Sequence, residues 1–186
     1  MNIKDLPAVD VILGIDFGSY RTGLAAIEVG SKARLIQKAR IVASSDNYVE
    51  RWEQTIEHTQ NFISEFLMGR PVAIAVEQPN SFRNGASTRI LTGGFGALLY
   101  WIHINKMAGI EVNTTHAKKI FCGVAGKGKE PTIARANELY GLDLKFHRDP
   151  KKSDDDVADA IQVAYTLRHH LIEEDDWFKE RSKRDA

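Results

Sequence analysis

The stretch VILGIDFGSYRTGLAAIEV, residues 11–29, decides the expected architecture. Its first part, residues 11–17, is an apolar run that contains one aspartate and precedes a Gly-Ser turn, which predicts a buried strand carrying a single acid. Residues 22–29 and 33–43 have the composition of two further strands, joined by a turn over residues 30–32. The chain is therefore expected to begin with three antiparallel strands.

The rest of the chain alternates between helical and strand patterns. Helical spacing predicts helices over residues 48–68 and 88–108, the second stopped by Gly109, with a short apolar strand over residues 71–77 between them. A strand that follows a helical crossover is expected to run parallel to the first strand and to be buried. The remaining expected elements are a strand over residues 110–112 and helices over residues 131–140 and 154–171. This order predicts the α/β class, with a mixed five-stranded sheet (three antiparallel strands, then parallel additions) flanked by helices.

Length and composition restrict the class of protein. The chain has 186 residues, 43% of them hydrophobic and 27% charged, which fits one globular domain, expected over residues 1–172, and a charged tail over residues 173–186. No stretch approaches the roughly 20 apolar residues of a membrane span, and no secretory signal is visible. The lone Cys122 agrees with a reducing compartment. The expected location is the cytoplasm of a bacterial cell, or of a host cell if the gene belongs to a phage.

Charge is balanced overall but unevenly distributed. The 25 basic and 25 acidic residues cancel. Residues 116–152 nevertheless hold nine basic and four acidic residues, whereas residues 153–186 hold ten acidic and five basic ones. Such a pair of segments is compatible with a phosphate-binding face beside a metal site, but by itself it more often indicates two solvated surfaces.

Four acids occupy positions where an acid needs an explanation. Asp16 lies inside an apolar strand, where an unpaired carboxylate is energetically costly. Glu77 ends the strand over residues 71–77, and ligands of open α/β sheets collect at such strand ends. Asp156 and Asp159 lie three residues apart and so share one face of a helix that packs on the core. Three separate elements thus offer carboxylates to one edge of the sheet.

These acids suit a site for hard divalent cations. Taken alone, a strand acid can form a salt bridge, and Asp154, Asp155 and Asp156 can cap a helix N-terminus. Together they have no competing His or Cys cluster, and carboxylate oxygens without softer ligands suit Mg²⁺, with Mn²⁺ as a substitute. Two such ions about 4 Å apart could hydrolyse a phosphodiester, one activating a water and the other stabilising the departing 3′ oxygen.

Three segments of the chain resemble the RuvC family of Holliday junction resolvases, within the RNase H-like superfamily. They are GIDFGSYRTGLAAIE at residues 14–28, VAIAVEQ at residues 72–78 and DVADAIQVAY at residues 156–165, in the order of the family. The resemblance implies an RNase H-like fold and a catalytic, metal-binding tetrad. Its members would be Asp16, Glu77, Asp156 and Asp159, with Asp155 as the alternative to Asp156. Phe17 and Tyr20 depart from the proline and arginine of the family pattern.

The same resemblance implies contacts with DNA. The two lysines of the family correspond to Lys118, with Lys119 as the alternative, and to Lys127 or Lys129. Phe82 corresponds to an aromatic residue that stacks on unpaired bases near the crossover, although a loop aromatic packed on the core is an equal alternative. The expected DNA-binding residues are Phe82, Arg83, Lys118, Lys119, Lys127 and Lys129, and Lys118 and Lys127 are also expected to take part in catalysis.

The implied function is a Mg²⁺-dependent endonuclease that nicks four-way DNA junctions and leaves 5′ phosphate and 3′ hydroxyl ends. Resolution needs two opposed cuts, so the resemblance implies a homodimer, for which residues 88–108, with their apolar run over residues 98–102, form the expected interface. Burial of that run within one subunit is the alternative. Two other functions stay open: a non-catalytic module that binds branched DNA, and a nuclease that also cuts forks and flaps. An intact acidic tetrad argues against the first.

Overall fold

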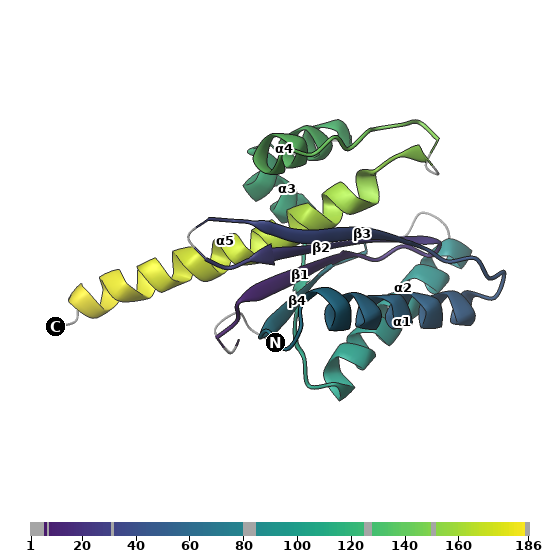
Figure 1. Cartoon of the computed structure of the whole chain (residues 1–186), viewed down its shortest axis with the longest axis horizontal. Coiled ribbons are helices and arrows are strands. Elements are labelled where there is room, and N and C mark those ends of the chain that lie inside the picture. Colours follow the sequence, from purple (N-terminus) through teal and green to yellow (C-terminus); the bar gives the residue numbers. More distant parts are fainter. Residues whose placement is uncertain are drawn as a thin grey trace.

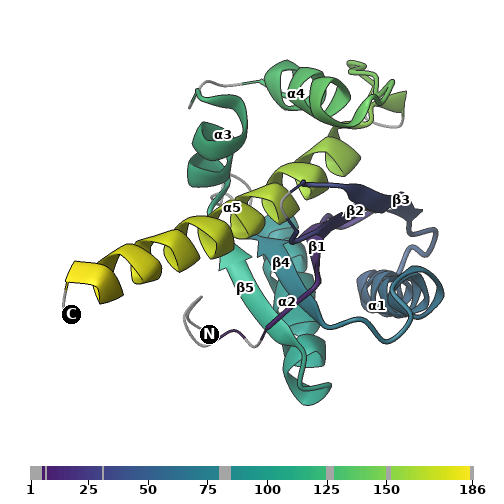
Figure 2. The same cartoon turned by 60° about the vertical axis from the view of Figure 1, so that its left-hand side comes forward.

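A single mixed sheet organises the molecule. The computed structural model describes residues 6, 8–30, 32–79, 85–124, 128–149 and 152–184. Its five strands lie in the order β3-β2-β1-β4-β5, with helices on both faces (Figures 1 and 2). The strands are β1 (Val11–Asp16), β2 (Arg21–Glu28), β3 (Leu35–Val42), β4 (Val72–Glu77) and β5 (Ala108–Val112), and the helices are α1 (Tyr48–Phe66), α2 (Gly85–Ile104), α3 (Thr114–Cys122), α4 (Glu130–Tyr140) and α5 (Asp155–Arg184). The predicted fold class is confirmed.

The strand directions bring two acids to one edge. β1 runs antiparallel to β2, with Asp16 opposite Gly23, and parallel to β4, with Ile15 opposite Val76. β5 continues the parallel part of the sheet beside β4. Since β1 and β4 run in the same direction and end in Asp16 and Glu77, the two carboxylates emerge at the same edge.

Alternation along the strands divides the core into two layers. Val11, Leu13 and Ile15 of β1 belong to the layer that also contains α1 and α2. Ile12, on the opposite face, belongs to the layer that contains α3, α4 and α5. Figure 1 shows these two sets of helices on opposite sides of the sheet. By the same alternation, Gly14 and Asp16 face α5.

Two glycines allow α5 to lie directly on the sheet. A Cβ atom at Gly14 would stand 2.1 Å from the carbonyl oxygen of Ala160, and one at Gly23 would stand 1.9 Å from the carbonyl oxygen of Asp156. No side chain fits at either distance, so glycine is required on both strands. The close approach sets the first turns of α5 against the ends of β1 and β2.

The structure differs from the expected elements at three places. α2 ends at Ile104 instead of residue 108, because the chain reverses at Lys106, which has a positive φ of 55°. Gly109 therefore lies within β5, where a Cβ atom would come within 2.7 Å of Ile102. The short helix α3 was not predicted from the sequence, although Asn113 caps its N-terminus and Gly123, in the left-handed conformation, ends it.

α5 is longer than expected. It continues to Arg184, beyond the predicted end at residue 171, and projects past the sheet in Figure 1. The division into a nuclease domain over residues 1–172 and a tail over residues 173–186 stays a prediction. Among the described residues, no helix combines the length and the apolar character that crossing a membrane requires.

Candidate active site

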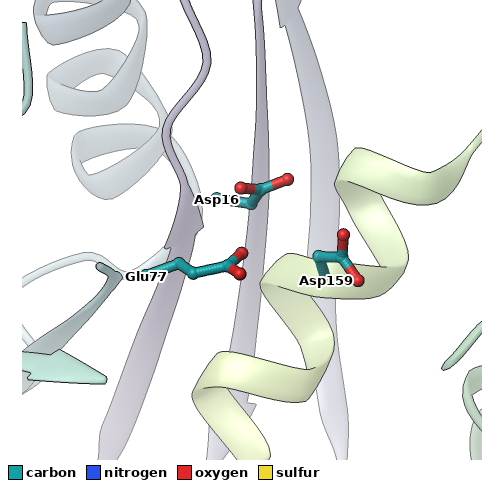
Figure 3. Close-up of side chains that lie close together, drawn as sticks. All are labelled: Asp16, Glu77 and Asp159. Atoms are coloured by element: carbon teal, nitrogen blue, oxygen red, sulfur yellow. The ribbon is translucent and has the colours of Figure 1, made fainter. Parts of the chain in front are cut away.

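Three of the four predicted acids converge at the edge of the sheet. Each of Asp16, Glu77 and Asp159 places a carboxylate oxygen within 4.8 Å of the other two. Figure 3 shows the three side chains pointing toward a common space, two from neighbouring strands and one from α5. Parallel pairing of β1 and β4 places Asp16 beside Glu77, and the glycine contacts under α5 bring Asp159 to them.

Burial and mutual repulsion shape the ionisation of this cluster. Desolvation, followed by the charges of Glu77 and Asp159, raises the pKa of Asp16 well above its ordinary value. Desolvation also raises the pKa of Asp159 to about 6, even though the nearby ammonium of Lys129 acts in the opposite direction. Asp16 and Asp159 therefore hold their protons to higher pH than exposed aspartates do.

Two lysines border the cluster. The Nζ atom of Lys129 donates to the carboxylate of Asp159 and lies 4.0 Å from that of Asp155. Partial burial lowers the pKa of Lys129, but Asp159, Asp16 and Glu77 together raise it above its ordinary value, so the ammonium stays charged. Lys118, on α3, donates to the carbonyl of Gly128, the residue immediately before Lys129.

The same residues line a shallow cavity of about 290 Å³. Lys118 and Lys129 form part of its wall, and the three clustered acids form another part. Lys119 is exposed on α3 and does not line this cavity. The predicted positions Phe82, Arg83 and Lys127 lie outside the described residues.

The structure does not bring the fourth predicted acid, Asp156, into the cluster. Its side chain, almost fully buried, accepts hydrogen bonds from Nε of Arg40 at 2.9 and 2.8 Å, and Nη1 of Arg21 lies 3.6 Å away. Arg40 also donates to Asp154 at 2.9 Å and to the carbonyl of Ser153. Asp156 is thus held in an ion-pair network that fastens the start of α5 to β3.

Asp155, the alternative acid, lies closer to the cluster. Its Oδ2 atom is 4.0 Å from Nζ of Lys129, and its charge contributes to raising the pKa of Asp159. Its Oδ1 atom is buried and has no hydrogen-bond partner among the described residues, although Arg21 lies 4.0 Å away. A buried carboxylate oxygen without a hydrogen bond is costly unless another positive group completes it.

Sequence reasoning missed Arg40 as a functional neighbour. Strand pairing places Asp16, Gly23 and Arg40 in one row across β1, β2 and β3, so their side-chain positions all face α5. Asp159 meets the acidic end of this row and Asp156 meets its basic end. The signal in the sequence was Arg40, an arginine inside an expected strand, and its meaning depends on the strand register.

The clustered residues fit a divalent cation. All the converging atoms are carboxylate oxygens, which are hard donors suited to Mg²⁺, Mn²⁺ or Ca²⁺. Desolvation, together with repulsion between the carboxylates, raises the pKa values of Asp16 and Asp159, so a bound cation would stabilise their ionised forms. Asp16, Glu77 and Asp159 are therefore the residues that would hold such an ion, and Asp155 borders the same space.

Comparison with known proteins gives a consistent result. The family model described as crossover junction endodeoxyribonuclease RuvC matches residues 12–167. A protein of that description from Methylococcus capsulatus is 30% identical over 159 residues, which cover 86% of this chain and 90% of the relative. Another protein of that description, from Xanthomonas axonopodis pv. citri, is 27% identical over 161 residues, which cover 85% of this chain and 87% of the relative.

Solved structures share the fold. RuvC of T. thermophilus in complex with a Holliday junction substrate has a TM-score of 0.68 at 22% identity and covers 88% of this chain and 94% of its own. The yeast mitochondrial Holliday junction resolvase Ydc2 has a TM-score of 0.59 at 12% identity, with 94% of this chain and 87% of its own covered. At 22% and 12% sequence identity, the similarity to these two structures shows a shared fold and nothing beyond it.

Proposed function

Because this chain belongs to the RuvC family of crossover junction endodeoxyribonucleases, we propose that it resolves four-way DNA junctions by paired, metal-dependent hydrolysis of phosphodiester bonds. The observation that carries this function is the convergence of Asp16, Glu77 and Asp159 on one point at the sheet edge. A binding module without catalysis would gain nothing from three crowded carboxylates that repel one another, one of them buried. Their presence at one point therefore favours an enzyme.

The proposed metal ligands are Asp16, Glu77 and Asp159, with Asp155 completing the site in place of Asp156. Mg²⁺ is the proposed ion and Mn²⁺ its substitute, since both prefer carboxylate oxygens. When bound there, a divalent ion supplies Lewis acidity that activates a water and stabilises the leaving oxygen. Asp156, already neutralised by Arg40, is assigned to holding α5 in place.

The lysines at the cavity wall are proposed to bind the DNA backbone. Lys129 keeps its charge beside the acidic cluster, so its ammonium is placed to interact with the phosphate that is cut. Lys118 lines the same cavity, and the exposed Lys119 follows it on α3. Contacts of this kind position a phosphate without reading sequence and weaken as salt rises. Phe82, Arg83 and Lys127 stay predicted DNA contacts.

The proposed dimer contact is one face of α2. Of the apolar run over residues 98–102, Leu98, Trp101 and Ile102 are buried in the core and cannot meet a partner. Tyr100 and Ile104, one turn apart, are 66% and 54% exposed, and a Cβ atom at Gly96, one turn earlier, would touch nothing. Gly96, Tyr100 and Ile104 thus form one exposed face of α2, on which a second α2 could pack closely. Replacing Tyr100 and Ile104 by Glu should give monomers in sedimentation and uncouple the two cuts.

Nicking assays on defined DNA structures test the function. Wild-type protein and the Asp16→Asn variant are incubated in Mg²⁺ with a mobile four-way junction, a Y-fork and a linear duplex. The wild type should cut the junction at symmetric positions and leave the duplex intact, whereas Asp16→Asn should bind the junction without cutting it. Absence of junction cleavage in both Mg²⁺ and Mn²⁺ would refute the proposal. Equal cleavage of the fork would support the broader branched-DNA nuclease.

A further inference from the structure

Three polar side chains connect α3, α4 and α5, which lie together on one face of the sheet (Figure 2). The hydroxyl of Thr132, on α4, donates to Oε1 of Gln162, on α5, at 3.1 Å. Sγ of Cys122, the last residue of α3, donates to the same hydroxyl at 3.8 Å. Thr132 and Gln162 are each 1% exposed, and both line the cavity that holds the acidic cluster. Cys122, Thr132 and Gln162 thus form a polar bridge next to that cluster.

Packing alone does not explain the polar bridge. In sequence its members stand beside buried apolar residues of the same core layer, namely Phe121, Ile133 and Ile161. A buried amide and a buried hydroxyl each lose hydration, and their mutual hydrogen bond adds little net stability over two apolar side chains of the same shape. What the hydrogen bond does add is a defined distance and direction between the two helices that carry its partners.

The spacing along each helix relates the polar bridge to the charged residues of the cavity. Each member of the bridge follows one of those residues by three or four positions: Cys122 follows Lys118, Thr132 follows Lys129, and Gln162 follows Asp159. Residues at this spacing lie on the same face of a helix, one turn apart. The bridge therefore joins the three helices one turn away from the groups that border the acidic cluster.

Lys129 depends most directly on this arrangement. Its side chain is 45% exposed, so packing restrains it little, while its ammonium donates to Asp159. Its backbone belongs to the start of α4, because its carbonyl accepts a hydrogen bond from the amide of Ile133 at 3.2 Å. The first turn of α4 also carries Thr132, whose hydroxyl is bonded to Gln162 on the helix of Asp159. One hydrogen bond thus sets the start of α4 against α5.

We propose that the hydrogen bond between Thr132 and Gln162 positions the ammonium of Lys129 against Asp159 for cleavage of the DNA. This inference rests on the proposed function. Thr132 and Gln162 are positioning residues, because they act through Lys129 and not on the DNA. Cys122 supports the hydroxyl of Thr132 from the other side. Desolvation raises the pKa of the Cys122 thiol, so the thiol keeps the proton that it donates.

Replacing both partners by apolar residues of similar shape tests the proposal. The double variant Thr132→Val/Gln162→Met leaves neither group unpaired, so its melting temperature and junction affinity should stay near those of the wild type. Its single-turnover cleavage in Mg²⁺ should fall about tenfold. It should bind Mn²⁺ about twofold to threefold more tightly, because a loosely held ammonium competes less for Asp159.

Two further variants serve as controls. Thr132→Ser keeps the hydroxyl and should keep the cleavage rate and the Mn²⁺ affinity of the wild type. Thr59→Val removes a fully buried hydroxyl from α1, on the opposite face of the sheet, where it donates to the carbonyl of Thr55. This control should also leave both measurements unchanged.

The dependence on Lys129 separates positioning from other roles. When Lys129→Met is already present, the double substitution should cause no further loss of rate and no further change in Mn²⁺ affinity. A further tenfold loss of rate would mean that Gln162 acts on the DNA itself, which would overturn the proposal. Unchanged cleavage and Mn²⁺ affinity in Thr132→Val/Gln162→Met would overturn it as well.

The measurements also separate this proposal from the proposed function. If the wild type does not cut the junction, the proposed function fails, whereas the Mn²⁺ titration, which needs no DNA, still tests the position of Lys129. If the double variant does not fold, Thr132→Val alone, which removes only the hydroxyl, is measured against the same expectations.

Discussion

Asp156 and Asp159 are two acids of the same helix, equally buried and three residues apart, yet their surroundings are opposite. Asp156 is 4% exposed and paired with Arg40, whereas Asp159 is 3% exposed and crowded by Asp16 and Glu77. Both stand over one row of the sheet, which begins with Asp16 on β1 and ends with Arg40 on β3. Burial alone therefore does not identify a metal ligand. What distinguishes the two acids is the local balance of charge, because Asp156 is paired with Arg40 and lies near Arg21, whereas Asp159 shares the single ammonium of Lys129 with the neighbouring carboxylates of Asp16 and Glu77.

The largest difference should appear when each acid is replaced by its amide. Asp159→Asn removes a ligand from the cluster and should lower junction cleavage by about a thousandfold or more, with little loss of stability. Asp156→Asn leaves Arg40 short of its main partner and should cost about 2 kcal/mol of the free energy of unfolding while cleavage stays within about tenfold. Nicking rates and urea unfolding measure both effects. If a stable Asp156→Asn protein no longer cleaves the junction, Asp156 must be assigned to the metal site.

The sequence could predict most of the fold because the relevant patterns are local. Apolar runs bounded by turn residues indicated the strands, an acid inside such a run singled out Asp16, and an acid at a strand end singled out Glu77. It could not separate Asp156 from Asp159, because this depends on which strand residues lie beneath each turn of α5. That arrangement is set by the register that places Gly23 between Asp16 and Arg40. Register is a long-range property, and no pattern within a single element encodes it.

Asp155 provides the next test of the comparison. It stands between the two acids in sequence, has a buried oxygen without a hydrogen bond, and approaches Lys129 from the side of the cluster. If it completes the metal site, Asp155→Asn should lower cleavage by about tenfold to a hundredfold, and a higher Mg²⁺ concentration should restore part of the rate. Cleavage measured across a Mg²⁺ titration checks this. An unchanged Mg²⁺ dependence would limit Asp155 to the N-terminus of α5.

Lys129 is the counterpart of Arg40, because it is the cation that contacts Asp159. Its ammonium bonds to Asp159, and so it competes with a divalent ion for the same carboxylate. Lys129→Met should therefore bind Mn²⁺ more tightly than the wild type, by about threefold to tenfold, and yet cut the junction more slowly. Calorimetric titration with Mn²⁺ and single-turnover cleavage measure the two effects. Weaker Mn²⁺ binding in Lys129→Met would show that the lysine supports the ion instead of competing with it.

The smallest expected effect is on stability, and it follows from the pKa of Asp159. In the folded protein this pKa is raised from 3.8 to about 6, chiefly by desolvation, so between these values the folded state holds a proton that the unfolded state has released. This contribution to stability is complete below pH 3.8 and is lost as the pH rises through about 6. Metal-free protein should therefore lose stability through this group on going from pH 5 to pH 7.5.

A divalent ion should offset that loss where the carboxylate is ionised. Mg²⁺ is expected to raise the melting temperature by about 3–6 °C at pH 7.5 and by much less at pH 5, where protons compete for the same oxygens. Thermal unfolding with and without Mg²⁺ at the two pH values measures this difference. Asp159→Asn, which cannot ionise, should show little Mg²⁺ effect at either pH. Asp156→Asn should keep the pH-dependent Mg²⁺ stabilisation of the wild type, because Arg40 and not a metal ion neutralises Asp156. Equal Mg²⁺ stabilisation of the wild type at both pH values would show that Asp159 does not bind the ion in competition with protons.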